Sequence, residues 1–190
     1  MKKGIILSLA LILSACSDKS SSKVKFVENP QIQALGAGKI KDFISGVKGH
    51  LESVMKSDPS GVNGMNMCSV DAMRLTSEYN KMIADSNVTI RRSALKYRNE
   101  ANKPDVTDEV VMNKFVESKN FEKPLVVEMR DSYRVYKALP TMKPCLACHG
   151  ENIKPEVQAL ITKSYPKDLA SGFKEGDFRG VFVADINLSK

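Results

Sequence analysis

The chain of 190 residues has no tryptophan, two histidines, four cysteines and 6% aromatic residues. The cysteines do not predict a disulfide framework, because each stands in a different local context. Its longest apolar stretch, residues 5–13, is too short to span a bilayer. The net charge is +7, but the basic residues are spread along the chain and are not interleaved with aromatic residues. This pattern predicts a solvated surface and no nucleic-acid partner.

The overall composition is that of a single globular domain. Hydrophobic residues make up 42% of the chain and charged residues 27%, and no internal repeat is present. A core can therefore form without covalent cross-links, and we expect one domain preceded by a targeting segment.

The N-terminus predicts the compartment. Lys2 and Lys3 precede the apolar stretch, and small residues precede Cys16, which is the layout of a bacterial secretory signal. Residues 13–16 (LSAC) resemble a bacterial lipobox, which implies cleavage before Cys16 and attachment of lipid to it. The alternative is an ordinary signal peptide with an incidental cysteine. In lipoproteins an aspartate directly after the lipidated cysteine favours retention in the inner membrane. This chain has Ser17 at that position, so we expect the outer membrane. We expect a periplasmic, lipid-anchored protein.

These patterns divide the chain into three parts. Residues 1–15 form the lipoprotein signal peptide, and residues 16–27 form a lipidated N-terminus and a serine-rich flexible tether. Residues 28–190 form the domain.

The most informative stretch is residues 143–150, KPCLACHG. Cys145 and Cys148 are spaced to form thioethers with the two vinyl groups of one haem, and His149 follows directly to ligate the iron on the proximal side. A structural disulfide or a zinc site would need the cysteines but not the adjacent histidine. The motif therefore favours haem c, one per chain, over these two alternatives.

Two helices are expected before this motif. Residues 30–57 place Ile40, Phe43, Val47, Leu51 and Val54 on one face, and residues 58–61 (DPSG) end that helix. A second helix, residues 62–84, has an apolar seam formed by Met65, Cys68, Ala72, Leu75, Tyr79 and Met82.

These helices carry further candidate ligands. His50, at the edge of the first apolar face, is either a partly buried helix histidine or a second axial ligand. Cys68 points inward, as an inert core residue or as a ligand. Met65, Met67 and Met73 are alternatives at the same position, although methionines at this spacing more often fill a core.

The remaining chain alternates basic loops with strands. A short strand is expected at residues 88–90, followed by a polar loop, residues 91–105, whose Arg91, Arg92, Lys96 and Arg98 are either solvated or pair with haem propionates. Further elements are a helix at 107–118, strands at 125–129, 132–139 and 178–186, and a helix at 156–164. Helices first and strands later predict an α+β domain, with N-terminal helices packed on an antiparallel sheet.

Several motifs together resemble a known family. They are Cys68 in the second helix, residues 92–99 (RSALKYRN) with Ala101-Asn102 and Pro104-Asp105, the CLACHG motif, and residues 165–180 with Tyr165-Pro166, Gly172-Phe173 and Gly176-Asp177-Phe178-Arg179-Gly180. The sequence resembles the single-haem c-type domains with a PAS-like fold, found as a free-standing cyanobacterial haem protein and as extracytoplasmic parts of bacterial sensors. Glu100 and Val106 depart from that pattern, where a proline and a tryptophan are usual.

The resemblance implies that Cys68 is the distal iron ligand. A thiolate would stabilise ferric iron and lower the reduction potential, and reduction would weaken the iron–sulfur bond. Met65, Met67, water or a gas could then take the sixth position.

The expected function is redox sensing or electron transfer, without enzymatic activity. A gas sensor with an exchangeable sixth ligand is the alternative, and a haem peroxidase is disfavoured because the chain has only two histidines. Since the sequence contains no transmembrane helix and no kinase or cyclase segment, a signal would pass to a separate signalling protein, or electrons to a redox partner.

Overall fold

The computed structural model describes residues 24–58 and 60–188. The predicted signal peptide, the lipidation site Cys16 and the tether up to residue 23 lie outside the described residues. None of the helices in the described part is both long enough and apolar enough to cross a membrane.

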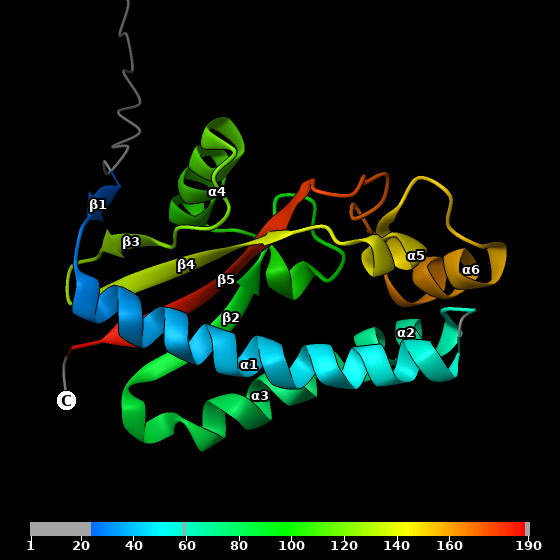
Figure 1. Cartoon of the computed structure of the whole chain (residues 1–190), viewed down its shortest axis with the longest axis horizontal. Helices are drawn as coiled ribbons and strands as arrows, with labels where there is room; N and C mark the ends of the chain where they lie inside the picture. Colours follow the sequence, from blue (N-terminus) through cyan, green and yellow to red (C-terminus); the bar gives the residue numbers. More distant parts are fainter. Residues whose placement is uncertain (1–23, 59, 189–190) are drawn as a thin grey trace, which may run out of the picture.

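The centre of the fold is a five-stranded antiparallel sheet with strand order β1-β3-β4-β5-β2. The strands are β1 (Lys25–Val27), β2 (Val88–Ser93), β3 (Leu125–Glu128), β4 (Ser132–Pro140) and β5 (Phe178–Asn187). The predicted α+β class with an antiparallel sheet is confirmed (Figure 1).

Helices cover both faces of this sheet. Helix α1 (Pro30–Ser57) buries Ile40 and Phe43 on one face and continues past the sheet to lie beside α2 (Val62–Asn66) (Figure 1). Helix α4 (Val106–Ser118) packs on the opposite face through Val111, Met112 and Phe115. The remaining helices are α3 (Ala72–Met82), α5 (Leu146–His149) and α6 (Pro155–Ser164).

The helix starts follow from local chemistry. The Asn29 side chain accepts a hydrogen bond from the Ile32 backbone N–H at 3.1 Å, and Pro30 stands in the first turn of α1. Asp105 caps α4 in the same way and forms a reciprocal capping box with Asp108. The predicted helices at 30–57 and 107–118 are confirmed within a residue.

The second predicted helix is present with one change. Between α2 and α3 the chain forms a π-helical turn, η1 (Met67–Asp71), which contains Cys68. Such turns shift the side chains that follow relative to the preceding helix. The predicted apolar seam is wrong at its end, because Met82 is 81% exposed.

Two segments of the sheet were not predicted as strands. Lys25–Val27, assigned to the tether, form β1 and pair with β3, so the folded domain begins before residue 28. Strand β2 runs to Ser93 and includes part of the predicted loop at 91–105. In the sequence, the charged residue Arg91 indicates a solvated loop, but in the structure its guanidinium forms ion pairs with Asp108 and Asp185.

Candidate functional site

His149 is held in one tautomer by the backbone. It ends the short helix α5, and its Nδ1–H donates to the Ala170 carbonyl at 2.7 Å. Burial, together with the positive charges of Arg179 and Arg98, lowers the pKa of His149 well below its ordinary value. The ring is therefore neutral, and its lone pair lies on Nε2, which is the form in which histidine binds a metal.

A loop after α6 fixes the motif from the other side. The Phe173 N–H donates to the His149 carbonyl at 2.9 Å, and the Gly172 N–H donates to the Gly150 carbonyl at 3.0 Å. A Cβ at Gly150 would lie 2.6 Å from the Leu146 carbonyl oxygen, so only glycine allows the chain to leave α5 in this direction. These contacts give the histidine ring little freedom to turn.

Arg98 connects the loop to the motif. Its guanidinium pairs with Asp168 at 3.1 Å and donates to the carbonyls of Cys148 at 2.7 Å and Ala170 at 3.1 Å. The side chains of Arg98 and Asp168 are only 8% and 10% exposed. The donors that Arg98 would offer to a propionate are thus already engaged, and the residue supports the carbonyl that orients His149.

Cys68 lies among the same charges as His149. Burial raises the pKa of the Cys68 thiol, while the positive charges of Arg92, Arg98 and Arg179 act in the opposite direction. The Tyr165 hydroxyl donates to the Cys68 carbonyl at 3.3 Å and so ties the π-helical turn to the end of α6. The fold thereby brings Cys68 to the haem-motif residues, which are far away in the sequence.

The two motif cysteines are free thiols, as is Cys68. Burial, and the neighbouring Cys68 and Cys145, raise the pKa of Cys148 against the effect of Arg98. Among the described residues, no three His, Cys, Asp or Glu side chains are grouped so that they could hold a metal ion. The zinc alternative therefore lacks its ligand set in this part of the chain.

The other sequence candidates are placed apart or are already engaged. Arg91 faces the opposite side of the sheet, where it binds Asp108 and Asp185. Lys96 donates to the Ser171 carbonyl at 2.6 Å and lies over the Phe173 ring. Only Arg92, of the four basic candidates, lies near the thiols without a carboxylate partner in the described residues.

The other candidate iron ligands differ in burial. His50 is exposed on α1, which contradicts its expected position at the edge of the core. Met73 is exposed as well. Met65 is buried, with its sulfur 3.9 Å from Nη1 of Arg98, and packs in the cluster that Cys148 borders, while Met67 is also buried.

Sequence reasoning missed Arg179, Asp168 and Ala170 as parts of this site. Arg179 is buried in β5 and acts electrostatically on His149 and Cys68. An arginine near the start of a mainly apolar strand, FRGVFVADI, was a usable signal. Ala170 contributes a backbone carbonyl, for which the sequence offers no signal.

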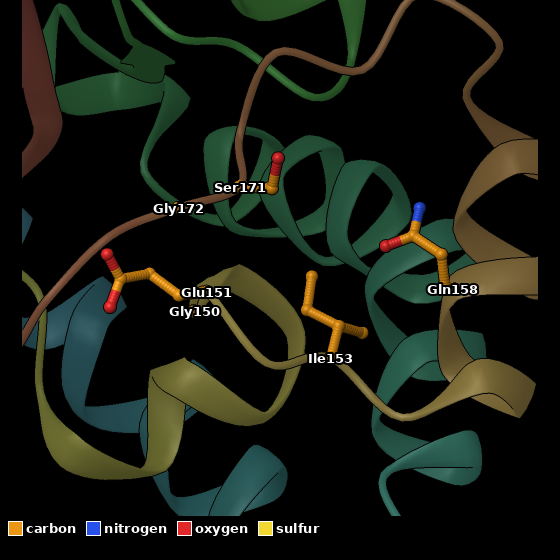
Figure 2. Close-up of a pocket in the computed structure, with 6 residues that line it drawn as sticks. All are labelled: Gly150, Glu151, Ile153, Gln158, Ser171 and Gly172. Carbon is orange, nitrogen blue, oxygen red and sulfur yellow. The ribbon is translucent and has the colours of Figure 1, made fainter.

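A surface pocket of about 410 Å³ lies next to the motif (Figure 2). It is lined by Gly150, Glu151, Ile153, Gln158, Ser171 and Gly172. These six residues include no cysteine and no histidine, so this pocket lies outside the group formed by the motif thiols and His149.

Comparison with known proteins agrees with the resemblance seen in the motifs. The model of the Tll0287-like family matches residues 14–187. The crystal structure of the cyanobacterial haem protein Tll0287 matches 86% of this chain and 99% of its own, with a TM-score of 0.61 and 24% sequence identity. No curated protein matches. The extent of the family match and the shared fold show that the chain belongs to the Tll0287-like family.

Proposed function

We propose that this chain binds one haem covalently through Cys145 and Cys148, with Nε2 of His149 as proximal ligand and Cys68 as distal ligand. The observation that carries the proposal is the hydrogen bond from His149 Nδ1 to Ala170, which leaves Nε2 available beside two free thiols in a CxxC spacing. The similar cyanobacterial structure is that of a haem protein.

The residues of the site fit such a group. The free thiols of Cys145 and Cys148 stand in one motif with a neutral imidazole, Cys68 acts electrostatically on Cys148, and the buried Nε of Arg179 has no hydrogen-bond partner among the described residues. A buried cation with an unsatisfied donor is costly unless a ligand supplies an acceptor. A bound haem would supply one-electron exchange between ferric and ferrous iron.

The proposed role is redox sensing or electron transfer in the periplasm. Lipid on Cys16 would hold the domain at the membrane, and a separate redox or signalling protein would receive the electron or the signal. Fractionation of cells expressing the wild type and Cys16→Ala tests the anchor. Release of the variant from the membrane fraction supports it, and identical fractionation contradicts it.

Covalent attachment is tested by production with the haem-attachment machinery. Intact mass should show one haem on the wild type and on His50→Ala, but not on the variant in which both Cys145 and Cys148 are serine. His149→Ala should lose the proximal nitrogen ligand in the EPR spectrum. A wild-type protein without covalent haem under these conditions would overturn the proposal.

The spectrum of the holoprotein then distinguishes the roles. Low-spin ferric iron with a thiolate EPR signal, and slow or absent carbon monoxide binding after reduction, indicates a closed redox centre. High-spin iron or rapid carbon monoxide uptake indicates an open sixth position, which would contradict the closed centre and favour gas sensing or peroxidase chemistry.

A further inference from the structure

A β-bulge directs Arg179 into the site. In the pairing of β4 with β5, Leu139 lies opposite Gly180 and Pro140 opposite Phe178, so Arg179 has no partner in the register. Gly180 has φ +142°, and a Cβ there would lie 2.6 Å from the Ser93 carbonyl oxygen. Bulges of this kind re-aim one side chain and are frequent beside functional sites.

The environment of Arg179 is poor in acceptors. The side chain is 6% exposed, its Nη1 donates to the Lys96 carbonyl at 3.0 Å, and the guanidinium lies 5.2 Å from the Phe173 ring centroid. Burial, with the nearby charges of Arg92 and Arg98, lowers the pKa of Arg179 to about 9. The guanidinium is thus a buried cation at neutral pH, with Nε unsatisfied.

Arg92 is a second cation beside the thiols, and it is half-buried. Its guanidinium lies 5.7 Å from the Phe182 ring centroid, and burial lowers the pKa of Arg92. Within residues 24–58 and 60–188, no carboxylate forms an ion pair with Arg92 or Arg179, whereas Arg98 in the same region is paired with Asp168. Two positive charges therefore remain without counter-ions beside Cys68 and Cys145.

We propose that Arg92 and Arg179 together form a site for two carboxylates, namely the two propionates of the haem. This inference rests on the proposed function and identifies the residues that position the group. Two guanidiniums match two carboxylates in charge, and the pairs would supply an acceptor for the unsatisfied Nε of Arg179 and a counter-ion for Arg92. Arg91 and Arg98 are excluded because each is already paired with a carboxylate. Lys96 is excluded because it is exposed, so water can satisfy the donors that its bond to the Ser171 carbonyl leaves free.

The test compares holoprotein variants that remove or retain each charge: Arg179→Met, Arg179→Lys, Arg92→Met and Arg92→Lys. Arg130→Met is the matched control, because Arg130 is almost fully exposed on the β3–β4 turn. At a fixed ambient potential, each methionine variant should shift the ferrous-to-ferric ratio about tenfold toward ferric, since a nearby cation favours the reduced state. The lysine variants should keep most of the wild-type ratio, and Arg130→Met all of it.

Two readouts separate propionate binding from other roles. The propionate bending bands in the resonance Raman spectrum should shift in the methionine variants and not in the control. The shift in the ferrous-to-ferric ratio should also persist in a Cys68→Ala background. Its disappearance there would assign the arginines to the Cys68 thiolate and overturn the inference.

Unchanged Raman bands and ratios in both methionine variants would overturn it as well. Arg92→Met leaves the β5 bulge intact, so the inference remains testable if Arg179→Met does not fold. Intact mass is measured on every sample. A wild type without covalent haem would refute the proposed function, whereas haem-loaded variants with wild-type spectra would refute only the role of the arginines.

Discussion

Replacing the buried Arg98 with methionine should strongly lower the free energy of unfolding of this protein. The Asp168 carboxylate, 10% exposed, would lose its ion-pair partner, and the carbonyls of Cys148 and Ala170 would lose donors at 2.7 and 3.1 Å. Removing one partner of a buried ion pair costs about 3–5 kcal/mol, because the other charge stays buried and unpaired. We expect a loss of about that size in the free energy of unfolding.

The matched control is Arg74→Met. Arg98 pairs with one carboxylate, and Arg74 pairs with two, those of Asp71 and Glu78, at 3.0 and 2.8 Å, but the Arg74 side chain is 53% exposed. Water and salt screen such pairs, so this variant should unfold at the wild-type denaturant concentration within error. The same substitution thus tests burial and not residue type.

Denaturant titration of the holoproteins measures both changes, with the midpoint and slope fitted for each variant. Arg98→Met combined with Asp168→Asn should be less unstable than the sum of the two single changes, because the unpaired charge is removed. Equal stabilities of Arg98→Met and Arg74→Met, or a loss below about 1 kcal/mol for Arg98→Met, would refute this reasoning.

Three further changes test other parts of the structure. Cys68→Ala should retain covalent haem but change its spin state and raise its reduction potential, and an unchanged absorption spectrum would remove Cys68 from the iron. Gly180→Ala should lower the free energy of unfolding by about 1–3 kcal/mol, because φ is +142° and Ser93 leaves no room for a Cβ; wild-type denaturation midpoints would contradict this. Burial raises the pKa of Asp108, but the ion pair with Arg91 and the hydrogen bond from Tyr136 together hold that pKa below its ordinary value. The stability from this depressed pKa is present above the unfolded-state pKa and lost as pH falls through the folded one. Wild type should therefore lose stability below about pH 4 more steeply than Asp108→Asn, and parallel curves of midpoint against pH would count against it.

The sequence predicted the regular elements where the period was clear. The helix at 30–57 and the strands at 125–129, 132–139 and 178–186 agree with the structure within one or two residues. Strand β1 was missed because three residues carry no periodicity, and its stability comes from pairing with β3. The end of β2 was missed because Arg91 has its counter-ions, Asp108 and Asp185, far away in the sequence.

The site likewise contains residues that the sequence alone could predict and residues that it could not. Cys145, Cys148 and His149 stand together in the sequence, so their predicted roles in thioether formation and proximal ligation follow from spacing alone. Cys68 could be connected to them only through the family resemblance, and its role as distal ligand stays a prediction. The structure adds that Cys68 lies near Cys145, Cys148 and the three arginines.

The sequence by itself determined the α+β class, through the periodicity of its segments, and the family, through motifs distributed along the chain. The haem chemistry of residues 143–150 follows from their local spacing and stays a prediction. Only the tertiary structure decided which charges are neutralised and which are not. It pairs Arg98 with Asp168, orients the His149 ring through a hydrogen bond to the Ala170 carbonyl, and leaves Nε of Arg179 without a hydrogen-bond partner in the described part of the chain. Burial and counter-ions are properties of side chains brought together across the fold, so the sequence around any one arginine cannot specify them.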